Sequence, residues 1–220
     1  MSAHDANVAL HILAGALGLL AGAVILAAPK GEKLHRRVGR VFAWIGGLAL
    51  ATAAIGVVFF EPLPPLVSAT LAFGYQYLSG LRALHLKAGG PGVVDALLAL
   101  LGLCGCAALY FFMGPGTASW TPVIGYSAIG YTGSIALYDL SRHLWAGAWL
   151  KYVRRLDHGL KMTGAYFAMM SAGVGNVLRD MQPWSQIGPS ALGVGVMTLL
   201  LLAYLAGAPG RAAFSALDAR

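Results

Sequence analysis

The chain has 220 residues, of which 58% are hydrophobic and only 10% are charged, and its formal net charge is +7. A soluble domain carries about 25% charged residues, so this composition excludes an ordinary soluble protein and indicates a polytopic membrane protein. The basic residues stand in short stretches between apolar runs, not on a soluble basic face. This pattern argues against a nucleic-acid partner and makes the lipid bilayer the expected partner.

The first residues, MSAHDAN, lack the positively charged region and the small-residue cleavage site of a secretory signal peptide. We therefore expect no cleaved leader here. Asn7 is predicted to cap the first helix, with Asp5 favourably placed near the positive end of the helix dipole.

Seven apolar runs follow, each about as long as a membrane-spanning helix. They lie near 8–28, 39–60, 65–86, 93–113, 121–142, 158–179 and 187–207. All 10 prolines fall between runs or in a first helical turn, where the missing N–H costs little. The pattern predicts an all-α fold, a single transmembrane helical domain over residues 1–220 with seven spans.

The basic residues predict how these spans are oriented. On this parsing, Arg179 alone of the 15 Lys and Arg residues falls at one end, and the others fall at the opposite end. Because basic loops are retained in the cytoplasm, the N-terminus is predicted outside and the C-terminus in the cytoplasm. The amphipathic stretch 141–156 is expected to form an interfacial helix or a cytoplasmic extension of the fifth span.

Polar residues at membrane depth are costly unless they are satisfied or functional, so they are the candidate site residues. His35 and His158 begin the second and sixth spans at one depth and are the candidate ligands of a shared haem or metal centre at the cytoplasmic mouth. His85 is a possible third ligand, and His143 is the weakest candidate. The alternative is that these histidines hydrogen-bond to backbone, water or headgroups.

Charged residues accompany the histidines at the inner level. Asp139 and His143 are four residues apart and are predicted to hydrogen-bond on one helix face. Arg36 and Arg40 complete the inner candidate site. We expect Arg40 to pair with one of the inner carboxylates, which are Asp95, Asp139 and Asp157.

A second polar group is expected at the outer level. His11 lies about one turn into the first span, and Asn176 and Arg179 lie at a similar depth of the sixth. We predict that His11 contacts Arg179 or Asn176; the alternative is an interfacial histidine and a snorkelling arginine.

Small residues recur at helical spacing in two spans. Ala14, Gly18 and Gly22 form one ridge, and Gly130 and Ser134 form a shorter pair. Such ridges allow close helix approach in lipid. They predict internal packing and leave a homo-oligomer open.

Two parts of the chain resemble one family. His11 to Gly15 (HILAG), Lys30-Gly31 and then HRRVGRVF at 35–42 resemble an uncharacterised family of bacterial multi-pass membrane proteins with an early histidine and a KG…HRxxGRxF turn into the second helix. The stretch HGLKM at 158–162 through Arg179 is similar to the family's later histidine–methionine helix. The resemblance implies a helical fold in the bacterial inner membrane and no known reaction. It marks polar positions at His11, His35, Arg36, Arg40, His158 and Arg179.

Three function classes stay open. No HExxH, GxSxG or P-loop motif occurs in the sequence. The chain is interpreted first as an uncharacterised membrane protein that acts as a structural or regulatory partner or a transporter. The alternative is a b-type cytochrome-like protein that holds haem b between two histidines. An intramembrane metal-dependent enzyme would need three or four converging ligands.

Overall fold

The computed structural model describes residues 2–86, 89–114 and 121–207, and these are almost entirely helical. The all-α prediction is confirmed within these ranges. Seven long helices occur at the predicted positions: α1 (Ala3–Ala27), α2 (Lys33–Ile55), α3 (Pro64–His85), α4 (Val93–Ala108), α5 (Pro122–Ser141), α7 (Arg154–Val177) and α8 (Trp184–Ala206). α2 and α4 each continue into a π-helical turn, Gly56–Phe60 and Leu109–Met113.

Local chemistry explains several helix ends. α1 begins earlier than predicted because Ser2 and Asp5 form a capping box, with Asp5 N donating to Ser2 Oγ at 3.1 Å. Asn7 is therefore not the cap, and its Nδ2 donates to the Thr52 carbonyl of α2 at 3.1 Å. The turn into α2 places Gly31 at a φ of +83°, a conformation that glycine adopts without strain.

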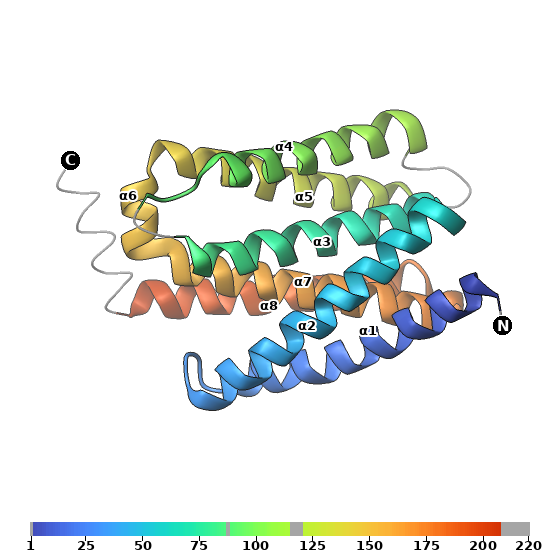
Figure 1. Ribbon diagram of the computed structural model, residues 1–220, viewed down its shortest axis with the longest axis horizontal. Coiled ribbons are helices and arrows are strands. Elements are labelled where there is room, and N and C mark those ends of the chain that lie inside the picture. The colour runs from blue at the N-terminus through green and yellow to red at the C-terminus, as the bar shows by residue number, and fades with distance from the viewer. Residues whose placement is uncertain (1, 87–88, 115–120, 208–220) are drawn as a thin grey trace.

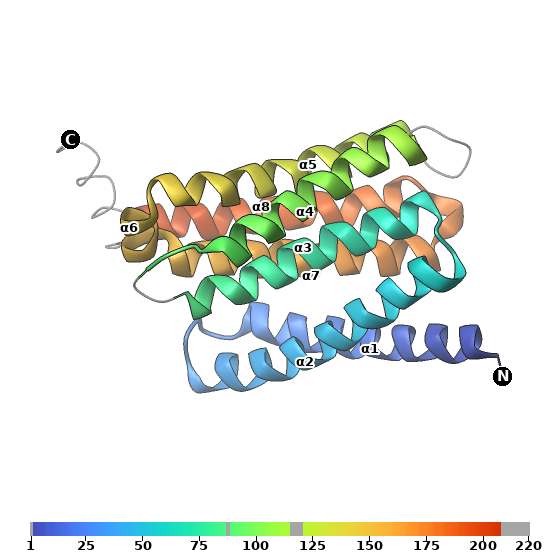
Figure 2. The same cartoon turned by 45° about the horizontal axis from the view of Figure 1, so that its top comes forward.

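α3 and α7 form the centre of the molecule. They pack along each other; α1 and α2 lie together on one side, α4 and α5 lie on the other, and α8 packs on α7 (Figures 1 and 2). The apolar core lies where α2, α3 and α7 meet, and it is built on the aromatic side chains Phe42, Phe73, Tyr77, Tyr166 and Phe167.

Glycine permits the close helix contacts that membrane proteins use in place of hydrophobic association. A Cβ on Gly22 would lie 2.3 Å from the Tyr166 ring. Ala14, Gly18 and Gly22 are all buried within the chain, so the first small-residue ridge packs internally.

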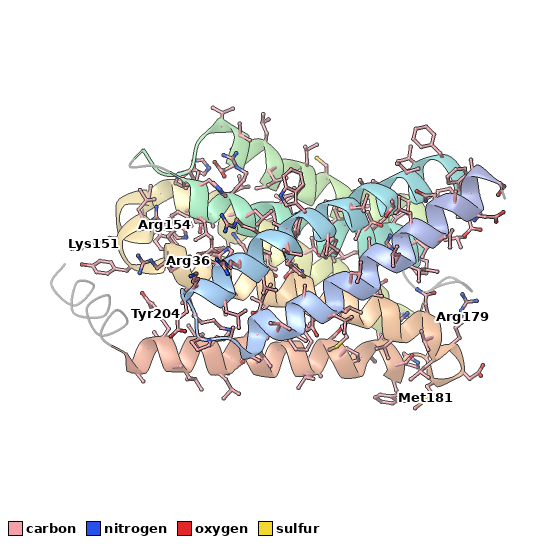
Figure 3. All side chains as sticks on the ribbon, turned by 60° about the horizontal axis from the view of Figure 1, so that its bottom comes forward. Arg36, Lys151, Arg154, Arg179, Met181 and Tyr204 are labelled. Atoms are coloured by element: carbon pink, nitrogen blue, oxygen red, sulfur yellow. The ribbon has the colours of Figure 1, made fainter. Side chains whose placement is uncertain are left out.

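Among the described residues, four helices are long and apolar enough to cross a membrane: α1, α2 with its π-turn, α4 continued through Phe111 of its π-turn, and α8. The other three long helices, α3, α5 and α7, carry most of the buried polar side chains. Arg36, Lys151 and Arg154 lie at one end of the molecule, called the basic end below, whereas Arg179 lies at the opposite end (Figure 3). Lys87, Arg211 and Arg220 lie outside the described residues.

The stretch 141–156, predicted as an interfacial helix or an extension of the fifth span, is not one regular helix. The chain forms a 3₁₀ turn (Arg142–Leu144), a single α-helical turn α6 (Ala146–Ala148) and a π-turn (Trp149–Val153). Arg142 and Trp149, assigned to the interface by their pattern, are 1% and 0% exposed. Both side chains turn into the protein because each finds a polar partner there.

Candidate functional site

Four charged side chains meet in the interior near the basic end, and we call Asp139, Arg142, Asp157 and Lys161 the ion network. None is more than 4% exposed. Arg142 Nη1 donates to Asp157 Oδ2 at 3.0 Å, and Arg142 Nε lies 3.2 Å from Asp139 Oδ1. Lys161 Nζ donates to Asp157 Oδ2 at 3.0 Å and also to Asp139 Oδ1. Two carboxylates face two cations, so the formal charge of the network is zero.

Helix periodicity builds the two halves of this network. Asp157 and Lys161 are four residues apart in α7 and therefore share one face. Asp139 and Arg142 are three residues apart at the end of α5. Packing α5 and α7 around α3 brings the two halves together, and each buried ion gains the opposite charge that offsets its desolvation.

α3 supplies neutral hydrogen-bond partners. Tyr75 Oη donates to Asp139 Oδ2 at 2.7 Å, and Ser79 Oγ donates to the same oxygen. Lys161 Nζ donates to Ser79 Oγ at 2.8 Å, so three acceptors surround the ammonium group. The buried ions are therefore both paired and hydrogen-bonded, the condition for keeping charges in an apolar interior.

Two aromatic residues cover the network on the side of the basic end. Trp149 Nε1 donates to Tyr138 Oη at 3.0 Å. The Arg142 guanidinium carbon lies 4.8 Å from the centre of the Trp149 ring, which is the geometry of a cation–π contact. The π-turn Trp149–Val153 thus places Trp149 over Arg142, and both side chains are buried.

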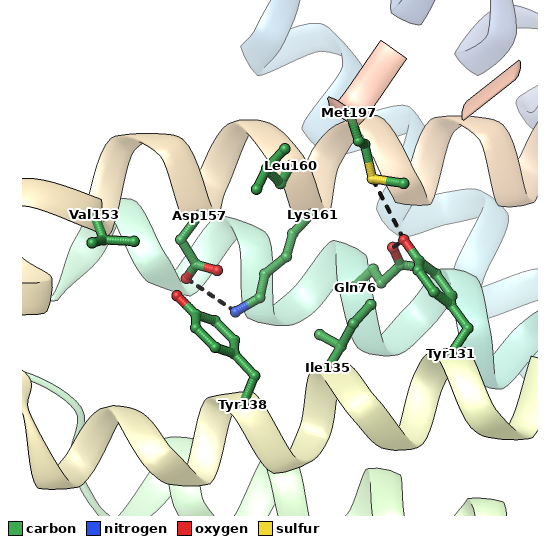
Figure 4. A pocket seen from close by; sticks show the side chains of 9 residues that line it. All are labelled: Gln76, Tyr131, Ile135, Tyr138, Val153, Asp157, Leu160, Lys161 and Met197. Atoms are coloured by element: carbon green, nitrogen blue, oxygen red, sulfur yellow. Dashed lines mark hydrogen bonds and ion pairs between the residues drawn. The ribbon is translucent and has the colours of Figure 1, made fainter. Parts of the chain in front are cut away.

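A cavity of about 330 Å³ adjoins the ion network. Its lining comes from α3, α5, α7, α8 and the π-turn before α7: Gln76, Tyr131, Ile135, Tyr138, Val153, Asp157, Leu160, Lys161 and Met197 (Figure 4). α5 packs on α3 and α4, and α8 packs on α7. Between α5 and α8, Tyr131 Oη reaches Met197 Sδ at 3.5 Å. The cavity therefore lies in the gap between these two helices, with ions on its inner wall and apolar side chains around them.

A second ion pair stands at the basic end. Arg82 Nε and Nη2 each donate to Asp95 at 2.8 Å, one to each carboxylate oxygen. Asp95 also accepts from the backbone N–H of Gly92, which caps α4. This bidentate pair joins α3 to α4.

These contacts correct two predictions about the inner charges. Arg40 is exposed and makes no ion pair within the described residues, because Arg82, Arg142 and Lys161 satisfy the three carboxylates instead. Arg36 is also exposed. The predicted hydrogen bond between Asp139 and His143 is wrong, since Asp139 faces the interior and His143 is exposed.

The three candidate histidine ligands occupy the basic end with different partners. His158 Nδ1 lies 2.8 Å from the Gly80 carbonyl of α3, and His85 Nδ1 lies 2.8 Å from the Leu81 carbonyl of its own helix. His35 Nδ1 is buried and has no hydrogen-bond partner among the described atoms. Across the described ranges, no three His, Cys, Asp or Glu side chains are arranged to hold a metal ion.

The predicted outer cluster divides into two separate contacts. His11 Nδ1 lies 3.1 Å from both the Ala49 carbonyl and Thr52 Oγ1, so it joins α1 to α2. Arg179 Nε donates to the Asn176 carbonyl at 3.2 Å. No hydrogen bond among the described residues connects His11 to either of them, because the polar side of α1 at this level faces α2.

Comparison with protein families, with curated proteins and with solved structures finds no match to this chain.

Proposed function

We propose that the chain is an integral membrane protein with seven spans, in the inner membrane of a bacterium, with its N-terminus outside and its C-terminus in the cytoplasm. Four helices meet the length and hydropathy expected of a span. α3, α5 and α7 are less apolar because they carry buried polar side chains that face the interior, and α5 and α7 carry Asp139, Asp157 and Lys161 of the ion network. The basic end supports the orientation, since basic residues are retained on the cytoplasmic side.

Cysteine labelling tests this topology in a chain in which Cys104 and Cys106 are replaced by alanine. A cysteine at Pro62, between α2 and α3, should react with a membrane-impermeant maleimide applied to intact cells, and cysteines at Leu34 and Tyr152 should not. In the next loop at this end, residues 115–119 lie outside the described residues, so Pro62 is the better outer position. Labelling of all three positions from outside would contradict the orientation.

We infer that the protein binds a small lipid-soluble molecule in the cavity between α5 and α8. One observation carries this proposal: the surface of the cavity of about 330 Å³ is mainly apolar, and Asp157 and Lys161 of the ion network are among its lining residues. Binding sites are typically such apolar pockets with a few convergent polar groups. Ionisable residues inside a membrane mark functional sites by default, because they are otherwise costly.

Blocking the cavity tests this function. Ile135→Trp places an indole in the cavity at a position outside the ion network, and Leu137→Trp on the outer surface of α5, where Leu137 is 59% exposed, is the matched control. Binding of heptylbenzene or 4-heptylphenol would be followed by native mass spectrometry in lipid nanodiscs. Saturable one-to-one binding that is lost in Ile135→Trp and kept in Leu137→Trp supports the proposal. Equal binding by all three proteins contradicts it.

A b-type cytochrome-like or metal-binding function remains the second candidate, with His35 and His158 as ligands. The supporting observation is that the Gly80 carbonyl fixes the His158 ring through Nδ1 and leaves Nε2 available, as outer partners of metal-bound histidines do. The absorption spectrum and metal content of purified wild-type, His35→Ala and His158→Ala proteins test it. Loss of a bound group in both variants supports a shared centre, and colourless, metal-free wild-type protein rules it out.

Homo-oligomerisation stays a prediction. The ridge of Ala14, Gly18 and Gly22 is used inside the chain, whereas Gly130 and Ser134 face outward and Ser134 Oγ donates to the Gly130 carbonyl. Only the second pair is therefore available for contact with another copy.

A further inference from the structure

We infer that the molecule bound in the cavity carries an uncharged hydroxyl head, of the phenol or alcohol class, on an apolar body. This inference rests on the proposed function and names the ligand class of the same site. It follows from three properties of the cavity wall: its charge balance, the hydrogen-bonding capacity that its side chains leave unused, and its size.

Charge balance argues against an ionic head. The ion network contains two carboxylates and two cations, and both cations are engaged. Each of the three N–H donors that an ammonium group offers has an acceptor at Lys161, namely Ser79, Asp139 and Asp157. An anionic or cationic head would leave one uncompensated charge in an apolar interior, which is strongly unfavourable.

Unused hydrogen-bonding capacity identifies the head group. Asp157 Oδ2 accepts from both Arg142 and Lys161, whereas Asp157 Oδ1 has no donor among the described residues. Tyr138 Oη accepts from Trp149, but the Tyr138 hydroxyl proton has no acceptor among them. Asp157 and Tyr138 both line the cavity, and the Tyr138 hydroxyl points toward the Asp157–Lys161 pair (Figure 4).

A hydroxyl group fits between these two side chains because it both donates and accepts. It would accept the proton of Tyr138 Oη and donate its own proton to Asp157 Oδ1. A carboxylate can only accept and an ammonium can only donate, so neither satisfies both side chains. An alkane satisfies neither of them and leaves buried polar groups without partners, which is costly.

The size of the cavity sets the body of the ligand. The cavity has a volume of about 330 Å³. A single ring fits, since a cavity of about 150 Å³ holds benzene. Ile135, Leu160 and Met197 supply the apolar walls, and the gap between α5 and α8 allows an aliphatic chain to extend toward lipid.

Four probes with one body and four heads test the inference: 4-heptylphenol, heptylbenzene, 4-heptylbenzoate and 4-heptylbenzylamine, the last protonated at pH 7. Affinity for wild-type protein in nanodiscs would be measured by native mass spectrometry, and Ile135→Trp would report partitioning into the lipid alone. The phenol should bind at least tenfold more tightly than the other three. Tyr138→Phe should weaken phenol binding at least fivefold and heptylbenzene binding by a smaller factor, because only the phenol carries a hydroxyl that reaches Tyr138 Oη.

The outcomes separate the two proposals. If heptylbenzene or a charged probe binds as tightly as the phenol, and Ile135→Trp abolishes that binding, the cavity is a ligand site but the hydroxyl inference is wrong. Water would then bridge Tyr138 and Asp157. If Tyr138→Phe weakens the binding of all four probes equally, the variant has disturbed the cavity. The test is then whether wild-type protein binds the phenol more tightly than the other probes and whether Ile135→Trp abolishes that binding. A phenol preference that Ile135→Trp abolishes supports the hydroxyl inference, and the absence of such a preference contradicts it. If no probe shows binding that Ile135→Trp removes, the proposed function itself fails.

Discussion

Replacing Lys161 by methionine should destabilise the protein by about 3–5 kcal/mol, the cost of breaking a buried ion pair on one side. The side chain is 3% exposed, so the loss is not screened by solvent. With an effective dielectric constant near 20, two charges about 4 Å apart interact with about 4 kcal/mol. The unpaired carboxylate can instead become neutral by taking up a proton. At pH 7 this protonation costs about 4 kcal/mol for an aspartate of ordinary pKa. The two estimates agree.

A double-mutant cycle separates charge imbalance from lost packing. Asp157→Asn alone leaves one excess cation, but Asp157→Asn with Lys161→Met leaves the neutral pair of Asp139 and Arg142, whose atoms lie 3.2 Å apart. The loss of stability in the double variant should therefore be smaller than the sum of the two single losses by at least about 2 kcal/mol. Unfolding by sodium dodecyl sulfate in mixed micelles, followed by circular dichroism, measures this. Lys151→Met, at an exposed lysine, is the control and should change stability by no more than about 0.5 kcal/mol.

Two results would refute this reasoning. A cost below about 1 kcal/mol for Lys161→Met would mean that water reaches the network. Strictly additive effects in the double variant would mean that the side chains of Asp157 and Lys161 contribute by packing and not by charge.

Further predictions compare matched positions. Gly193→Ala should cost about 1–3 kcal/mol of stability through overpacking, because the new Cβ would lie 2.6 Å from Phe167 Cβ. A Cβ at Gly195 in the same helix meets nothing within 4 Å, so Gly195→Ala should be tolerated. Thermal melting in detergent compares the two variants, and equal melting temperatures would contradict the α7–α8 packing. Arg82→Gln should lower the melting temperature, because it leaves the buried Asp95 carboxylate unpaired. Arg40→Gln, at an exposed side chain, should leave the melting temperature unchanged. A lower melting temperature in Arg40→Gln alone would contradict the assignment of Arg82 as the partner of Asp95.

Much of the fold could be predicted from the sequence because its signals are local. Long apolar runs locate the seven long helices, although Pro189 lies inside α8, and Arg36, Lys151 and Arg154 lie at the end opposite Arg179 (Figure 3). Helix ends were less predictable where a side chain caps the backbone, as Ser2 does for α1. The burial of Arg142 and Trp149 in the 141–156 segment was not predicted, because an amphipathic pattern does not distinguish a lipid interface from a protein interior with its own polar partners.

The candidate site was only partly predictable. Asp139 was named as a candidate site residue with His143 as its expected partner, but Arg142 and Lys161 were interpreted as topology-setting charges. The spacing of Asp157 and Lys161, four residues apart, is a visible signal of an ion pair on one helix face. The contribution of α3 was not visible, because the hydrogen bond from Tyr75 to Asp139 depends on packing between residues 64 positions apart in the chain.

The most direct test of the ligand-binding account is an inventory of the small molecules that leave the membrane with the protein. Wild-type, Ile135→Trp and Leu137→Trp proteins would be extracted from native membranes in polymer nanodiscs, and their bound molecules identified by mass spectrometry after solvent extraction. The account predicts a hydroxyl-bearing lipid-soluble compound, near one per protein, in the wild type and in Leu137→Trp but absent from Ile135→Trp. Identical inventories for all three proteins would contradict it.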